Sequence, residues 1–230
     1  MSDHRKTLPR SARWGLASLS LSMLMPSLDT SIANIGLPTL AQTFDATFQD
    51  VRWVVLAYLI AITALIVSAG RLGDLFGRRR LLLAGIALFT LTSLFCGIAP
   101  ALGWLIAARA AQGLGAAIMM SLTIAMIGET VPKERTGSAM GLLGTMSAIG
   151  TSLGPSLGGV LITAMGWQTI FLINVPLGVL NLWLAWRYLP ADKVSAAPVS
   201  GIDIKGTLTL TAALAAYALA LTTSHLGLAS

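Results

Sequence analysis

Long apolar runs follow one another along this chain and leave it few possible folds. A bilayer core about 30 Å thick needs about 20 apolar helical residues to cross it. Seven runs meet this requirement, at 14–36, 51–69, 81–99, 101–127, 138–165, 169–188 and 207–226. Because every backbone amide in hydrocarbon needs an internal partner, runs of this length predict membrane-spanning α-helices.

The composition excludes the other broad classes of protein. Apolar residues make up 55% of the chain and charged residues only 10%, whereas a soluble domain carries about 25% charged residues. The single cysteine, Cys96, has no partner for an intrachain disulfide. We therefore predict an all-α polytopic membrane protein rather than a soluble enzyme, a disordered chain or a disulfide scaffold.

The basic residues predict the orientation of the spans. Thirteen of the fifteen Lys and Arg residues lie in the N-terminal tail and on alternate connections: Arg5, Lys6, Arg10, Arg13, Arg71, Arg78, Arg79, Arg80, Lys133, Arg135, Arg187, Lys193 and Lys205. By the positive-inside rule, this side faces the cytoplasm and so does the N-terminus, in a multi-pass protein of the cell membrane. The net charge of +6 therefore reflects topology, and we expect a lipid bilayer rather than nucleic acid as the partner.

One connection differs from the others and suggests a domain boundary. Residues 189–205 are richer in Ala, Pro, Ser and charge than the other connections, as in a linker. We predict a cytoplasmic tail at 1–13, a six-helix transmembrane domain at 14–188, a cytoplasmic linker at 189–205 and a seventh span within 206–230. A second domain would follow this span, so we expect the chain to be the amino-terminal portion of a larger transporter.

Two ionisable residues lie deep inside predicted spans. Asp29 is roughly 22 Å from the inner end of the first span, and Arg109 is roughly 12 Å from the outer end of the fourth, at 1.5 Å per residue. Both depths fall in the outer half of the bilayer. A structural ion pair and a snorkelling arginine are the alternatives to a functional site. The short side chain of Asp29 snorkels poorly, which favours function.

The connection between the second and third spans carries an unusual pattern of glycine and charge. We interpret residues 70–80 as a tight cytoplasmic turn, because Gly70 and Gly77 permit close backbone turns. Asp74 and Arg78 are four residues apart and would pair if a helical turn forms. A purely topological role for the arginines, Arg79 included, would leave Asp74 unexplained.

The fifth span carries a stripe of glycines. Gly150, Gly154 and Gly158 recur every four residues and lay one smooth face along a helix, which lets another helix approach closely. Pro155 removes an amide hydrogen bond and predicts a bend in this helix. Gly141 and Gly159 belong to the same run of small residues. Simple close packing is the alternative to a specific role.

In their order and spacing, these motifs resemble the major facilitator superfamily. The turn matches the pattern G-x-L-[AS]-D-x-x-G-[RK]-[RK], with Gly73 at the one position that departs from it. Residues 105–117 resemble the fourth-span signature, and 141–159 match the fifth-span antiporter signature. Residues 28–38 resemble the first-span signature of the fourteen-helix drug/proton antiporter branch, and 129–137 are similar to that branch's connection between the fourth and fifth spans.

The resemblance implies a proton-coupled exporter of hydrophobic, often cationic small molecules, built from two inverted three-helix repeats in each half. It implies a part in proton coupling for Arg109, a proton or substrate site at Asp29, and a cytoplasmic gate at Asp74. No cofactor is implied, since the proton gradient supplies the energy. We expect Asp29 and Arg109 to approach in one state of the cycle and separate in another, directly or through Gln112.

Three alternatives remain at the level of the sequence. An uptake symporter of the same superfamily is the nearest, although the glycine stripe resembles that of exporters. The second is a truncated membrane protein without transport activity of its own. A membrane enzyme is the third and is disfavoured, because the sequence has no metal cluster, nucleophile–base set or phosphate loop. Neither His4 nor His225 is placed for catalysis.

Overall fold

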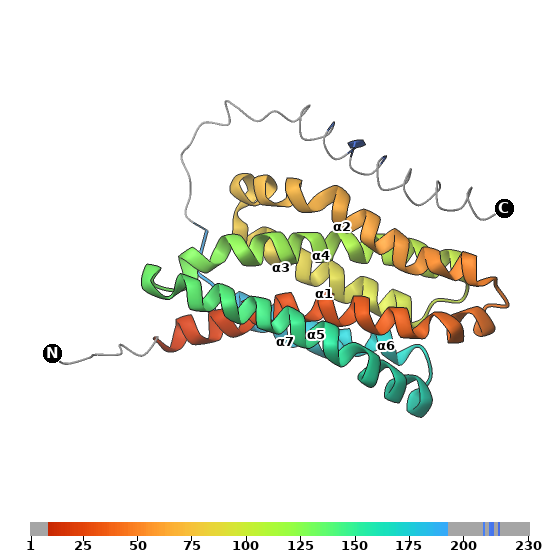
Figure 1. Ribbon diagram of the computed structural model, residues 1–230. Helices are drawn as coiled ribbons and strands as arrows, with labels where there is room; N and C mark the ends of the chain where they lie inside the picture. The colour runs from red at the N-terminus through yellow and green to blue at the C-terminus, as the bar shows by residue number, and fades with distance from the viewer. Residues whose placement is uncertain (1–8, 193–208, 210–211, 214–215, 217–230) are drawn as a thin grey trace.

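The computed structural model describes residues 9–192, 209, 212–213 and 216 of the chain. The described part is helical, with no strands: α1 (Arg10–Thr43), α2 (Phe48–Phe76), α3 (Arg78–Gly97), α4 (Leu102–Thr130), the 3₁₀ turn η1 (Lys133–Arg135), α5 (Thr136–Met165), α6 (Thr169–Leu172) and α7 (Asn174–Tyr188). The long helices lie lengthwise in one bundle (Figure 1). The predicted all-α fold is therefore confirmed, whereas most of the linker and the seventh span lie outside the described residues.

Five of these helical segments are long and apolar enough to cross a membrane: α2, α3, α4, η1 with α5, and α6 with α7. The first helix, α1, does not meet this criterion although it is 34 residues long. Its inner positions include Ser18, Ser22 and Asp29, all buried within the protein. Polar residues on α1 are thus shielded from lipid by the helices around it.

The connection between α2 and α3 is shorter than the sequence predicts. Residues 70–76 continue α2 as helix, and Gly77 alone separates α2 from α3. Gly77 has a φ of +94°, a backbone conformation that a residue without a Cβ adopts readily. The prediction of a tight turn over residues 70–80 is therefore wrong, because one glycine suffices to reverse the chain.

The helices form two halves, α1–α3 and α4–α7, and the main contacts run between helices of different halves. The first helix of one half, α1, packs most extensively on α5, and the first helix of the other, α4, packs on α2. In the same way α3 packs on α4, while α7 packs on α1 and α3. Each half thus places its leading helix against the second helix of the other half. This pattern agrees with two inverted three-helix repeats.

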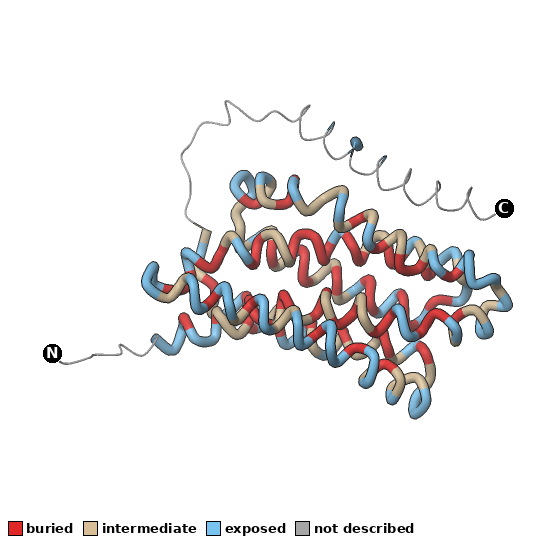
Figure 2. Tube along the Cα trace, in the orientation of Figure 1, coloured by how far each residue is buried: buried red, intermediate tan, exposed pale blue. Residues whose placement is uncertain are grey.

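Two apolar clusters fill the bundle and leave a polar layer between them. One cluster includes Leu19, Met25, Leu82 and Met119. The other includes residues such as Ile32, Val54, Leu105 and Phe171. Figure 2 shows buried positions running along the inner sides of the helices. On α1, α3 and α4 the polar residues Asp29, Ser93, Arg109 and Gln112 lie where one cluster gives way to the other.

The glycine stripe of α5 lies directly against α1. A Cβ added to Gly150 would lie 2.8 Å from the carbonyl oxygen of Leu24, and one added to Gly158 would lie 3.3 Å from Cγ2 of Ile32. Gly154 lies against Ser31. Gly141 and Gly159 have open space around them and take no part in this contact. The stripe thus serves as a close helix–helix contact. Pro155 is exposed within α5, with helix on both sides.

Candidate functional site

The centre of the bundle holds an ion pair between Asp29 of α1 and Arg109 of α4. Nη1 of Arg109 donates to Oδ2 of Asp29, and the side chains are 0% and 1% exposed for Arg109 and Asp29 respectively. Nε of Arg109 also donates to the main-chain carbonyl of Val54 at 3.2 Å. Removing two charges from water is costly unless they are paired and hydrogen-bonded. The pairing therefore accounts for the burial of both residues.

Neutral polar side chains complete this cluster. Gln112 accepts a hydrogen bond from Nη1 of Arg109 at 2.6 Å and donates from Nε2 to Oδ1 of Asp29 at 3.1 Å and to Ser93 at 2.6 Å. Asn174 of α7 donates to Oδ1 of Asp29 at 2.7 Å. The two oxygens of Asp29 thus have three donors from two other helices. The structure brings Asp29, Arg109 and Gln112 together in one network.

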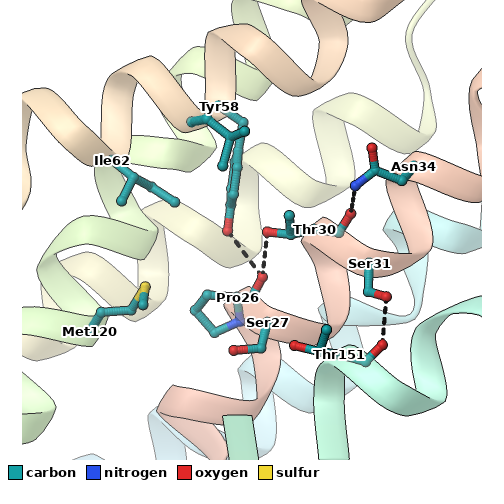
Figure 3. Close-up of a pocket in the computed structure, with 10 residues that line it drawn as sticks. Pro26, Ser27, Thr30, Ser31, Asn34, Tyr58, Ile62, Met120 and Thr151 are labelled. Carbon is teal, nitrogen blue, oxygen red and sulfur yellow. Dashed lines mark hydrogen bonds between the residues drawn. The ribbon is translucent and has the colours of Figure 1, made fainter. Parts of the chain in front are cut away.

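Tyr58 separates this network from a surface pocket. The Arg109 guanidinium lies over the Tyr58 ring, 4.1 Å from its centroid, and 5.6 Å from that of Phe171. Stacking of a guanidinium on an aromatic face is a favourable cation–π contact. The Tyr58 hydroxyl donates to the carbonyl of Pro26 at 3.3 Å, on the pocket side (Figure 3). One side chain therefore touches both the ion pair and the pocket.

The pocket opens between α1, α2, α4 and α5. It has a volume of about 370 Å³. Its wall combines apolar and uncharged polar side chains: Pro26, Ser27, Thr30, Ser31, Asn34, Tyr58, Leu59, Ile62, Met120 and Thr151. Small-molecule sites in proteins commonly combine an apolar lining with a few placed polar groups. Asp29 and Arg109 are not among the lining residues, so the charged pair lies behind the pocket wall.

The residues predicted as a gate form a second charged cluster, near the Gly77 break between α2 and α3. Nε of Arg78 donates to Oδ1 of Asp74 at 2.9 Å, and Nη1 donates to Glu129 of α4 at 2.8 Å. Arg78 thereby ties α2, α3 and α4 together. A Cβ added to Gly73 would meet Cδ2 of Leu122 of α4, so this leucine side chain would have to shift. The contact favours glycine at the position where the sequence departs from the family pattern. Gly70 lies in α2 near Ser121.

Asp192 holds the first turn of α3. Its Oδ1 accepts from the backbone amide of Arg79 at 2.7 Å, and its Oδ2 accepts from that of Arg80 at 3.2 Å. The Arg79 side chain donates to the carbonyl of Trp186 at the end of α7. A carboxylate on free amides at a helix N-terminus is stabilising. Asp192, four residues beyond the end of α7 at Tyr188, is thus fixed to the start of α3.

Sequence reasoning missed most of the pocket wall, and also Glu129 and Phe171. Among the residues it missed, Tyr58, Ser93, Asn174 and Asp192 make the hydrogen bonds and ring contacts described above. Asn174 could have been found from the sequence, because, like Gln112, it is an amide side chain inside an apolar run, where such residues are unusual. Tyr58 and Ser93 could not have been found in this way, since a tyrosine or serine within a span is common in a helix core. Asp192 lies in a charged connection, where nothing in the sequence distinguishes a cap from a solvated carboxylate.

A bundle of membrane-spanning helices with a buried ion pair behind a pocket is the arrangement of a membrane transport protein. The family comparison agrees. The model of the Major Facilitator Superfamily matches residues 19–228, and the chain belongs to this superfamily of membrane transporters.

Individual relatives agree with this assignment. The chain is 39% identical over 175 residues to the multidrug resistance protein Stp of Mycobacterium tuberculosis, covering 76% of this chain and 33% of Stp. It is 35% identical over 193 residues to the riboflavin transporter RibZ of Clostridioides difficile, covering 84% of this chain and 42% of RibZ. The chain therefore spans less than half the length of these relatives.

A solved structure shares the fold. It is a bacterial homologue of the human lysosomal transporter Spinster, in an inward-facing and unoccupied conformation. The TM-score is 0.67 at 17% identity, and the match covers 85% of this chain and 48% of that one. At this identity the likeness shows the fold alone.

Proposed function

We propose that this chain forms the amino-terminal half of a proton-coupled exporter of hydrophobic or cationic small molecules. Its partners are the bilayer of the cell membrane, protons, the exported molecules and a carboxy-terminal half of the transporter. In this proposal the N-terminus is cytoplasmic, and the proton gradient replaces any cofactor. The observation that carries the proposal is the buried Asp29–Arg109 pair, one side chain away from a pocket. The multidrug resistance protein among the relatives supports the substrate class.

The partners of Arg109 allow Asp29 to bind and release a proton. Besides Asp29, the guanidinium contacts Gln112, the Val54 carbonyl and the rings of Tyr58 and Phe171. It therefore keeps stabilising contacts when a proton neutralises the carboxylate and the ion pair separates. The carboxylate takes the proton while it faces the outside and gives it up to the inside.

In this proposal the Arg78 cluster serves as the gate of the cycle. It joins α2, α3 and α4 through side chains that are partly exposed. Ion pairs at exposed positions are weak, commonly below about 1 kcal/mol each. They can therefore break and re-form as the helices move, which suits a contact that opens and closes with each cycle.

The test is proton-driven efflux by the full-length protein in everted membrane vesicles. Asp29→Asn keeps the shape of the side chain and removes its proton site, so we expect efflux driven by an imposed pH gradient to be lost at normal abundance. Asp45→Asn is the matched control, because Asp45 is exposed at a φ of +47° that asparagine adopts readily. Undiminished efflux by Asp29→Asn across several cationic substrates would remove Asp29 from proton coupling.

Proton-coupled uptake is the second candidate, and the riboflavin transporter among the relatives favours a single aromatic solute as its substrate. The direction of transport separates the two. An exporter accumulates the solute in everted vesicles when the lumen is acidic, whereas an uptake symporter moves it out of the same vesicles. The second result would replace the export proposal.

A further inference from the structure

We infer that the pocket selects apolar molecules that donate hydrogen bonds, and that it disfavours anions and molecules that only accept them. This inference rests on the proposed function and names the class of ligand for the same pocket. It is carried by the direction of the hydrogen bonds in the pocket wall. Figure 3 marks the bonds that several of the lining side chains make.

The pocket wall carries no formal charge at neutral pH. Of the ten described residues that line it, six are polar, and none of these is acidic or basic. The nearest charged residues described above, Asp29 and Arg109, neutralise each other and are buried. An anion in the pocket would therefore lose its hydration without gaining a cationic partner, and this loss is expensive in an apolar site.

Each polar side chain of the wall donates one hydrogen bond to the main chain, and among these described residues Asn34, whose amide has two N–H groups, keeps a further donor. On α1, Thr30 donates to the Pro26 carbonyl at 2.8 Å. Ser27 lies 3.1 Å from the Met23 carbonyl and shares a second hydrogen bond with the Ser147 hydroxyl at 2.8 Å. The Asn34 amide donates to the Thr30 carbonyl at 2.9 Å. These bonds follow the ordinary pattern in which Ser, Thr and Asn side chains bond the carbonyl one turn earlier.

The same holds for the three remaining polar side chains, Ser31 of α1, Tyr58 of α2 and Thr151 of α5. Ser31 donates across to the Thr151 carbonyl of α5 at 2.7 Å, and Thr151 donates to that of Ser147 at 3.1 Å. Tyr58 donates to the Pro26 carbonyl at 3.3 Å. Apart from the Ser27 oxygen, which is hydrogen-bonded to Ser147, the hydroxyl and amide oxygens of the wall keep lone pairs that can accept from a ligand.

This arrangement sets a preference among ligands of equal size. A ligand with an N–H or O–H group can bond a wall oxygen without disturbing the existing bonds. A ligand with only acceptors finds a spare N–H at Asn34. Elsewhere on the described wall it must turn a hydroxyl away from its carbonyl, where it loses about as much as it gains. One net hydrogen bond of ordinary strength corresponds to a difference of about fivefold in affinity.

Three tricyclic probes of nearly equal shape test this preference: carbazole, with one N–H donor; fluorene, with no polar group; and dibenzofuran, with one oxygen acceptor. Their binding to the full-length protein in lipid nanodiscs is measured by equilibrium dialysis and corrected for partition into empty nanodiscs. We expect carbazole to bind about fivefold more tightly than the other two. Equal or tighter binding of dibenzofuran would overturn the inference.

Variants assign the effect to the pocket. Thr30→Val and Ser31→Ala each remove one wall oxygen. We expect at least one of them to lower the affinity for carbazole towards that for fluorene, while the affinity for fluorene stays unchanged. Thr63→Val is the matched control, because Thr63 is exposed outside the pocket and makes the same bond to its own helix, at 2.9 Å to Leu59. A carbazole preference that survives both pocket variants would place the probe elsewhere and refute the assignment.

The outcome is separable from that of the proposed function. Dialysis measures binding at equilibrium, so it needs neither a proton gradient nor transport. If the protein fails to export but prefers carbazole, the export proposal is refuted and the inferred ligand class stands. If the protein exports but shows no preference among the probes, only the inferred ligand class is refuted.

Discussion

Arg109 is the residue on which the buried polar contacts of this protein converge. It bonds a carboxylate, an amide and a main-chain carbonyl and stacks on two rings. A lysine offers a single ammonium group in place of the planar fork. The geometry of the guanidinium therefore matters here as much as its charge.

We expect Arg109→Met to destabilise the protein strongly, because it leaves the Asp29 carboxylate buried without a cation. Breaking a buried ion pair in this way costs about 3–5 kcal/mol. The double variant Asp29→Asn with Arg109→Met removes both charges and should recover more than half of the loss. Thermal unfolding of the full-length protein in detergent measures both. Additive losses in the double variant would contradict a direct coupling between the two side chains.

At the scale of helices, the glycine stripe sets the distance between α1 and α5. We expect Gly154→Leu to force these helices apart, because Ser31 occupies the space that the new side chain needs. Overpacking of this kind typically costs about 1–3 kcal/mol. Transport by the full-length protein should fall sharply while membrane insertion continues.

Gly159→Leu is the control for this variant, since it makes the same change five residues away in the same helix. No other part of the described structure lies within 4 Å of a Cβ at Gly159. We expect near-normal transport from this variant. A similar loss in both would trace the effect to the helix itself and not to its contact with α1.

The cap on α3 makes a separate prediction. We expect Asp192→Ala to lower the free energy of unfolding by about 1 kcal/mol, since two backbone amides lose their acceptor. Glu134→Ala removes an exposed carboxylate in η1 and should have little effect. Chemical denaturation of the full-length protein in detergent gives both values. Equal stability of the two variants would mean that the Asp192 cap contributes nothing measurable.

The sequence predicted the helices better than their ends and contacts. Apolar runs located six described spans, but α1 begins at Arg10 and α2 continues to Phe76, because helical hydrogen bonds extend past the apolar stretch. Depth in the membrane placed Asp29 and Arg109 at similar levels. Depth does not show which helix faces pack together. The position of Tyr58 between two sites and the contact of Asp192 with α3 could therefore be seen only in the structure.

For the whole molecule, the direction of the bundle in the membrane is testable with single cysteines. The native Cys96 is the chain's one cysteine and is buried, so it gives little background. Gly103 and Gly137 lie near opposite ends of the bundle, and a Cβ has open space at each. In intact cells an impermeant thiol reagent should label Gly103→Cys and not Gly137→Cys. Labelling in the reverse sense would invert the proposed orientation.

The separation of Asp29 and Arg109 along the chain has a consequence for synthesis. The two residues are 80 positions apart, and ribosomes add about 5–20 residues each second. After Asp29 is made, its cation therefore follows only about 4–16 seconds later. During that interval α1 carries an uncompensated carboxylate in a helix of modest hydropathy. Stable residence of α1 in the bilayer thus waits for the fourth helix to leave the ribosome, and truncation before Arg109 should leave α1 exposed to membrane quality-control proteases.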